Sequence, residues 1–199
     1  ILVLRKYTVS PIGLVTVSEI QVEEGGNQTS FEKLTMVNKP SRKGLEFNSV
    51  TDRIGISNSA TDTMSDKDFT IESVFVWYGV GLKNETQQTI FSCGDIRYGF
   101  SGGNARIGMY TPSTGWADAI PDNPIGREIS LKATVTPTNV KIWVDGVLKG
   151  DKNYTGAIMA QVASHIGTLG GGSYWFNGMV KSLKIVSKRK VILDYDFTD

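Results

Sequence analysis

The residues best suited to contact a ligand lie in a proline- and glycine-rich segment from Tyr110 to Pro124. Within it, Trp116 could offer a flat apolar face to a sugar ring. Asp118 and Asn123 could exchange hydrogen bonds with the hydroxyl groups of the same ring. The segment predicts a loop that binds carbohydrate, although Trp116 could equally fold back onto the core.

Further side chains are candidates for the same ligand-binding site. Arg97 and Tyr98 belong to a predicted strand that could line a concave sheet. Tyr174 follows Gly170–Gly172, whose glycines favour a loop that exposes an aromatic ring. Trp143 lies opposite three aliphatic residues of its predicted strand, so it is either a surface platform or a contact to a second sheet.

Metal binding is a separate hypothesis, based on aspartates in predicted loops. Hard oxygen ligands suit calcium, and Asp66 and Asp68 are the residues that we expect to hold it, with Asp62, Asp118 and Asp122 as further loop carboxylates. The sequence has no EF-hand spacing. Aspartates are also common in solvated turns that bind no metal.

Chemistry that needs several histidines or cysteines is not expected. His165 is the only histidine and Cys93 the only cysteine, which is too few for an ordinary zinc site. His165 also has no nucleophile-elbow motif near it. A single cysteine cannot form an internal disulfide, so the fold must depend on its hydrophobic core.

The composition is that of one globular domain, and its near-zero net charge favours no strongly charged partner. The 199 residues, 40% of them apolar, can bury one sizeable core. With 21 basic and 20 acidic residues the net charge is +1, so no overall field favours nucleic acid. The sequence contains no apolar run long enough to span a bilayer and no secretory signal, so we expect no membrane insertion.

Short segments of alternating polarity, together with 22 glycines, predict an all-β fold. Residues 128–136 alternate regularly, which indicates a strand with one solvated face. Residues 68–78 carry apolar side chains on both faces, so we expect a central strand that is covered on both sides. Residues 139–149 contain Asp145-Gly146, a pair that favours the type I′ turn of a hairpin.

Several segments occur in an order that is typical of one known family. They are Gly44–Asn48, Asp68–Glu72, Ile142–Gly146, His165–Gly167 and Phe176–Ile185. On these segments, residues 44–199 resemble the laminin-G-like branch of the concanavalin A-like lectin and glucanase superfamily. The resemblance implies a jelly-roll sandwich of two antiparallel sheets. Members of the superfamily include carbohydrate-binding modules, adhesin domains and parts of phage or bacterial surface proteins.

The resemblance also raises the question of catalysis, because glucanases of this superfamily use a Glu-x-Asp-x-x-Glu motif. The counterpart here is Asp194, Asp196 and Asp199, with aspartate at both outer positions. On a regular strand Asp194 and Asp196 share a face that Asp199 does not. We expect a terminal strand with a solvated acidic face and no enzyme activity.

These observations predict a non-catalytic recognition module, binding carbohydrate, in a phage or bacterial surface protein. The alternative is a structural or assembly domain of a virion or cell-surface fibre that binds no glycan, and a third hypothesis is a glycoside hydrolase. Residues 1–43 fall outside the resemblance and are expected to be N-terminal strands or an attachment segment, through which the chain could form a homo-oligomer. The expected location is extracellular, at a cell surface or on a virion, with a glycan or a surface protein as partner.

Overall fold

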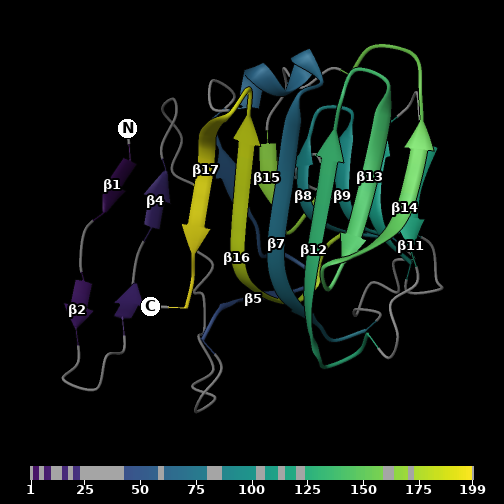
Figure 1. The fold of residues 1–199 in the computed structure, drawn as a ribbon. Helices are drawn as coiled ribbons and strands as arrows, with labels where there is room; N and C mark the ends of the chain where they lie inside the picture. The colour runs from purple at the N-terminus through teal and green to yellow at the C-terminus, as the bar shows by residue number, and fades with distance from the viewer. Residues whose placement is uncertain are drawn as a thin grey trace. The chain divides into compact units, whose positions relative to one another are not determined.

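The computed structural model describes residues 2–4, 7–9, 15–17, 20–22, 43–57, 61–79, 87–101, 106–111, 115–119, 124–158, 164–169 and 173–198 (Figure 1). For the residues before 43, and for 62, 101, 106, 107, 118 and 119, it describes the backbone alone. The chain divides into two compact units, Ile1–Arg42 and Lys43–Asp199.

The first unit contains two antiparallel strand pairs. Strand β1 (Leu2–Leu4) pairs with β4 (Ile20–Val22). Strand β2 (Tyr7–Val9) pairs with β3 (Val15–Val17). Each of these strands has three residues, so both ladders are short.

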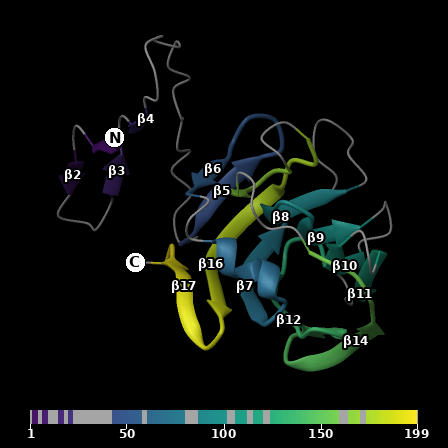
Figure 2. The ribbon, with the colours of Figure 1, turned by 90° about the horizontal axis from the view of Figure 1, so that it is seen from above.

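The second unit is a sandwich of two antiparallel sheets, seen face-on in Figure 1 and from above in Figure 2. One sheet has seven strands in the order β14-β13-β12-β7-β16-β17, and β5 pairs with β16 as well. Its strands are β5 (Leu45–Asn48), β7 (Phe69–Trp77), β12 (Glu128–Val135), β13 (Asn139–Val144), β14 (Val147–Asn153), β16 (Asn177–Ser187) and β17 (Lys190–Asp196).

The other sheet has six strands in the order β11-β10-β9-β8-β15-β6. Its strands are β6 (Ile54–Ile56), β8 (Gln88–Cys93), β9 (Ile96–Ser101), β10 (Arg106–Thr111), β11 (Gly115–Ala119) and β15 (Ser164–Ile166).

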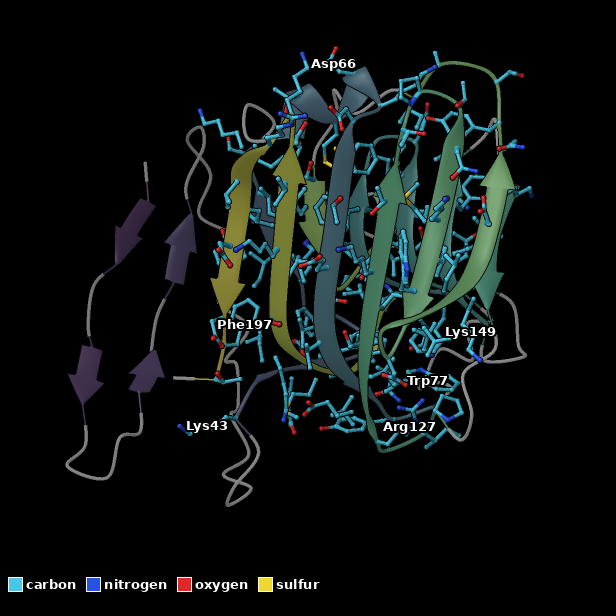
Figure 3. The ribbon with its side chains drawn as sticks, viewed as in Figure 1. Lys43, Asp66, Trp77, Arg127, Lys149 and Phe197 are labelled. Carbon is cyan, nitrogen blue, oxygen red and sulfur yellow. The ribbon has the colours of Figure 1, made fainter. Side chains whose placement is uncertain are left out.

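A single 3-10 helix, η1 (Asp62–Asp66), precedes β7 in the described part of the chain. Figure 3 shows Asp66 at one end of the sandwich, with Trp77 and Arg127 at the other. The two-sheet antiparallel architecture predicted from the sequence is confirmed.

The core lies between the two sheets and follows the alternation of each strand. On β12, Ile129, Leu131, Ala133 and Val135 are fully buried, while the polar residues between them face outward, as predicted. Strand β7 lies between β12 and β16, so its predicted central position is also correct.

The prediction that β7 is covered on both sides is wrong for most of the strand. Phe69, Ile71 and Phe75 are buried against the second sheet, but Glu72 and Val74 on the other face are half-exposed. The error arose because Val74 and Val76 made this face look apolar. The polar residues of the neighbouring strands leave it open to solvent.

The hairpin at 139–149 forms as predicted. Asp145 and Gly146 have φ angles of 51° and 77°, which is the left-handed conformation that a type I′ turn requires. The Asp145 carboxylate also accepts a 3.0 Å hydrogen bond from the Ser130 amide and pairs with Arg127 at 2.9 Å. The turn is thereby fastened to β12, which fixes the register of β13.

The predicted loop from Tyr110 to Pro124 is partly strand. Strand β10 continues to Thr111 and β11 begins at Gly115, so Trp116 lies on a strand and not in a loop. The physical reason is pairing, because β11 is hydrogen-bonded along β10 and the apolar Ala117 faces the core.

None of the helical segments among the described residues has the length and apolar character of a membrane span.

Candidate functional site

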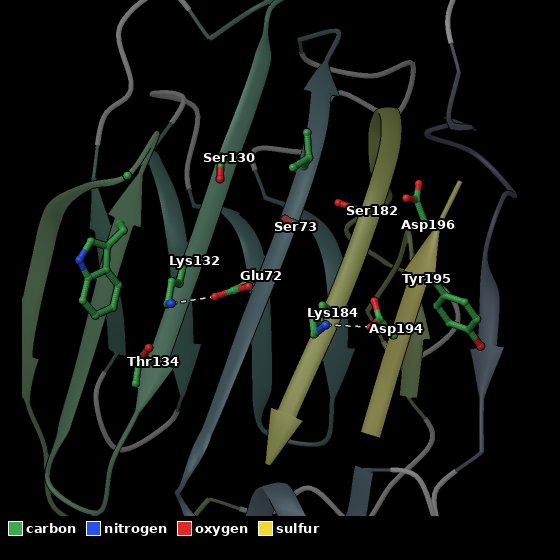
Figure 4. A pocket seen from close by; sticks show the side chains of 13 residues that line it. Glu72, Ser73, Ser130, Lys132, Thr134, Ser182, Lys184, Asp194, Tyr195 and Asp196 are labelled. Carbon is green, nitrogen blue, oxygen red and sulfur yellow. Dashed lines mark hydrogen bonds and ion pairs between the residues drawn. The ribbon is translucent and has the colours of Figure 1, made fainter. Parts of the chain in front are cut away.

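A groove of about 740 Å³ crosses the outer face of the seven-stranded sheet (Figure 4). Side chains from β7, β12, β13, β16 and β17 line it, so neighbouring strands each contribute to one continuous surface. The lining residues are Glu72, Ser73, Val74, Ser130, Lys132, Thr134, Trp143, Gly146, Ser182, Lys184, Asp194, Tyr195 and Asp196. Most of them are polar, and Trp143 and Tyr195 are the aromatic residues among them.

One row of side chains runs straight across the floor of this groove. Lys132 on β12 lies opposite Trp143 on one side and opposite Glu72 on the other. Lys184 on β16 lies opposite Glu72 and opposite Asp194. These five residues, which we call the charge row, alternate positive and negative charge and end at a tryptophan.

Ion pairs hold the members of the charge row together (Figure 4). Lys132 Nζ lies 2.7 Å from Glu72 Oε1, and Lys184 Nζ lies 2.8 Å from Asp194 Oδ2. The hydrogen bond to Asp194 raises the pKa of the Lys184 ammonium above its ordinary value. Exposed ion pairs of this kind contribute little to stability. Their main effect is to orient donors and acceptors within the groove.

Trp143 forms the aromatic end of the charge row. It is half-buried, and Lys132 Nζ lies 5.8 Å from the centre of its ring. Of the two alternatives left open by the sequence, the surface platform is therefore the one that the structure supports, because β13 directs Val140, Ile142 and Val144 into the core instead.

Tyr98 lies beneath the floor of the groove, not on a ligand-facing surface. Its side chain is fully buried, and its hydroxyl donates to the Leu131 carbonyl and lies 3.0 Å from the Ser73 hydroxyl. Burial raises the pKa of Tyr98 well above its ordinary value. The prediction that Tyr98 contacts a ligand does not fit this position, because the ring crosses the core to hold the opposite sheet.

The acidic strand β17 places Asp194 and Asp196 at the edge of the groove, where Figure 4 shows both carboxylates. Asp194 is engaged by Lys184. Hydrogen bonds from Thr198 to the Asp196 carboxylate hold the pKa of Asp196 below its usual range. Asp199, the third residue of the motif, lies outside the described residues.

The structure brings three of the predicted ligand-binding residues together on the other sheet. Trp116 and Arg97 both lie directly opposite Tyr110, on either side of it. The Arg97 guanidinium carbon is 4.7 Å from the centre of the Tyr110 ring and 5.5 Å from that of Tyr174. The Tyr110 and Trp116 ring centres are 5.8 Å apart. We call these four residues the aromatic row.

The structure does not describe the side chains of two other predicted ligand-binding residues. The backbone of Asp118 lies on β11 opposite Gly108. Asn123 lies wholly outside the described residues.

The two aspartates expected to hold calcium have other partners where the structure describes them. Asp66 Oδ2 lies 2.5 Å from Lys188 Nζ, so the Asp66 carboxylate forms an ion pair with a lysine. The backbone carbonyl of Asp68 accepts hydrogen bonds from Lys188 and Ser187. In the ranges where side chains are described, no group of three or more His, Cys, Asp or Glu residues could hold a metal ion. The side chains of Asp62 and Asp118 and the whole of Asp122 lie outside the described residues, so calcium binding stays a prediction.

Sequence reasoning missed the charge row and Tyr110. The signal for the charged residues was present, since the alternation of each strand places a charged side chain on its outward face. These side chains are Glu72, Lys132 and Lys184. What the sequence lacked was the register that aligns these positions. Tyr110 was treated as the start of a loop, which hid its place beside Arg97.

Comparison with known proteins identifies the fold. The chain is similar to domains LG4-5 of the mouse laminin alpha1 chain, with a TM-score of 0.57 and 12% identity, covering 93% of this chain and 50% of that one. This likeness shows the laminin-G-like, concanavalin A-like jelly-roll fold that the sequence predicted.

Two further solved structures are similar at lower scores. Domain 4 of AbnA, a GH43 extracellular arabinanase from Geobacillus stearothermophilus solved with arabinotriose, has a TM-score of 0.49 and 18% identity, covering 65% of this chain and 64% of that one. The enzymatically active domain of tailspike protein 2 of bacteriophage CBA120 has a TM-score of 0.49 and 12% identity, covering 78% and 30%. The chain thus spans less than two thirds of the length of each of these chains. No protein-family model and no curated protein sequence matches it.

Proposed function

We propose that this protein is a non-catalytic recognition module that binds a neutral oligosaccharide in the groove across the seven-stranded sheet. The observation that carries the proposal is the charge row, which places Trp143 at one end of a line of oriented polar groups. The groove is open along the sheet, so the ligand is a chain of sugar residues and not a small buried molecule.

The chemistry of the groove suits a sugar without charge. A pyranose ring has an apolar face that can lie against an indole and a rim of hydroxyls that donate and accept hydrogen bonds. Lys132 and Lys184 supply donors, while Glu72 and Asp194 supply acceptors. Because each lysine is paired with a carboxylate, the floor has no unbalanced positive charge to attract an anion.

The carboxylates of the groove are poorly suited to glycosidase chemistry, which supports a non-catalytic role. A general acid needs a raised pKa so that it holds its proton near neutral pH. The pKa of Asp196 is shifted in the opposite direction, and Asp194 is held by Lys184. We therefore propose binding without hydrolysis.

The proposal is tested by screening the purified chain on a glycan array, with and without a chelator, and titrating a neutral hit by calorimetry. We expect Trp143→Ala to weaken that binding at least about tenfold, because the apolar platform is lost. Lys132→Gln should weaken it as well, because it removes a donor and releases Glu72.

Trp116→Ala is the matched control, since it removes a half-buried tryptophan from the other sheet. It should leave binding of the neutral hit unchanged, and thermal melting should show that each variant is folded. A blank array with folded protein would contradict the proposal and favour the structural or assembly domain. Full binding by Trp143→Ala would also contradict it, because the glycan would then bind outside the groove.

The expected location follows from the proposed ligand. A module that binds oligosaccharide chains meets them outside the cell, so we propose an extracellular, cell-surface or virion protein. Sedimentation of the protein with cells or virions, followed by immunodetection, tests this placement.

A further inference from the structure

The aromatic row lies on the outer face of the six-stranded sheet, away from the groove. Tyr98 and Met109 are fully buried, so their neighbours Arg97 and Tyr110 point to the opposite side of their strands. Ala117 is buried in the same way and leaves Trp116 on the outer face. The two rows therefore belong to opposite faces of one sandwich.

Arg97 is the centre of this row. Its guanidinium lies between the rings of Tyr110 and Tyr174, which hold the group in place by cation–π contact. Arg97 Nη1 also donates a long hydrogen bond of 3.5 Å to Gln87 Oε1. In the part of the chain that the structure describes, no carboxylate lies within ion-pair distance of Arg97.

This arrangement differs in charge from the groove. The charge row pairs each lysine with an acid, whereas Arg97 is a positive charge flanked by aromatic rings. A second cation, Lys152 Nζ, donates a 3.1 Å hydrogen bond to the Trp116 carbonyl at the far end of the row. The row thus combines two cationic side chains with the exposed parts of three aromatic rings, all of them half-buried.

We infer that the aromatic row is a second binding site, which takes a sugar ring that carries a carboxylate. A guanidinium is planar and always charged, and its N–H groups match the two oxygens of a carboxylate. The neighbouring rings give the apolar face of the sugar a surface to lie against. This inference goes beyond the proposed function, and it stands even if the groove binds nothing.

An acidic sugar fits the row better than an acidic peptide. A peptide that binds a sheet gains affinity mainly through backbone pairing at an edge strand. The aromatic row instead presents side chains across the faces of β9, β10 and β11, and Arg97 lies two strands away from β11. An extended peptide would lie across these strands without pairing to them.

The test compares acidic sugars with neutral counterparts of the same shape. One arm uses tetragalacturonate and its carboxyl-reduced form, and the other uses sialyllactose and its carboxyl-reduced form, so the two sources of carboxylate are separated. We expect at least one acidic sugar to bind the full chain about tenfold or more tighter than its neutral counterpart. Added salt should reduce this preference.

Variants then place the binding on the row. Arg97→Gln should abolish the preference for the acidic sugar, and Arg97→Lys should restore only part of it because the planar fork is missing. Trp143→Ala, in the groove, should not change it. If thermal melting shows Arg97→Gln to be unfolded, Trp116→Ala provides the second test, and it should weaken binding of the acidic sugar about fivefold or more.

Three results would overturn the inference. The first is an absence of acid preference in both arms. The second is an acid preference that persists in folded Arg97→Gln. The third is equal affinity for hexaglutamate, which would mean that charge alone is recognised. Since the neutral hit of the groove depends on Trp143 and the acidic sugar on Arg97, failure of one site is distinguishable from failure of the other.

Discussion

Tyr98 is a single side chain that fastens the two sheets to each other. It starts on β9 of the six-stranded sheet and ends at the Ser73 hydroxyl and the Leu131 carbonyl of the seven-stranded sheet. Both contacts are buried, so no water can replace the phenol hydroxyl if it is removed. Because Ser73 also lines the groove, this contact fixes part of the groove floor.

We predict that Tyr98→Phe lowers the free energy of unfolding by about 1–3 kcal/mol at pH 7, because a buried hydroxyl and a carbonyl lose their partner. Urea unfolding followed by fluorescence measures this change. Tyr195→Phe is the control, since Tyr195 is 37% exposed and should have little effect. A Tyr98→Phe variant as stable as the wild type would contradict the prediction.

The difference in unfolding free energy between the wild type and Tyr98→Phe should depend on pH. Burial raises the pKa of Tyr98 above its ordinary value of 10.0, so above pH 10 the unfolded chain has lost a proton that the folded chain keeps. The folded state then binds more protons than the unfolded state, and stability falls as pH rises. The advantage of the wild type over Tyr98→Phe should therefore shrink above pH 10.

The position of Tyr98 was predictable from the residues around it. Ile96, Tyr98 and Phe100 alternate with Arg97 and Gly99, which indicates an apolar face directed to the core. The ring was assigned to a ligand because its predicted strand could line a concave sheet. The Tyr98 hydroxyl is instead hydrogen-bonded inside the core, and no pattern along the sequence identifies its partners.

At the scale of strands, both candidate sites are rows that cross several strands. Alternation within a strand predicted which residues of β12 and of the hairpin face outward. Register between strands was not predictable, because β7 and β16 are far apart in the sequence and their alignment includes a bulge. The face of a residue could therefore be predicted, but its neighbours on that face could not.

Strand β9 depends on a close approach that only glycine permits. Strand β8 has an irregular register opposite Gly99, between Thr89 and Phe91. A Cβ atom on Gly99 would lie 2.3 Å from the Gln88 carbonyl oxygen and 2.9 Å from the Ile90 amide nitrogen. Both are backbone atoms, so neither can move aside without disturbing the sheet that carries the aromatic row.

We predict that Gly99→Ala lowers the free energy of unfolding by about 3 kcal/mol through this clash. Gly55→Ala on β6 of the same sheet is the matched control, because nothing lies within 4 Å of its added Cβ. The control should change stability by less than about 1 kcal/mol. Equal effects of the two substitutions in chemical denaturation would show that the clash is relieved elsewhere.

At the scale of the whole molecule, the described core lies entirely within the unit Lys43–Asp199. The unit Ile1–Arg42 contains only short strand pairs where it is described. Isolated two-stranded ladders are marginal in water. These strands would therefore gain stability by adding to a larger sheet, which is the basis for expecting attachment or oligomerisation through this segment.

Deletion of residues 1–42 should leave the melting temperature of the remaining unit within about 2 °C of the full chain, since the described core is untouched. We also expect light scattering to give an oligomer for the full chain and a monomer for residues 43–199. Loss of folding on deletion would contradict the first expectation. Equal monomeric masses would contradict the second.

The outermost strands of the seven-stranded sheet have a consequence for aggregation. An open sheet can grow into a fibre when another copy pairs with its edge. Here β14 carries Lys149, Asp151 and Lys152, and β17 carries Asp194 and Asp196, all of them exposed. A copy that approached either edge would have to strip water from these charges, which disfavours pairing between copies along β14 or β17.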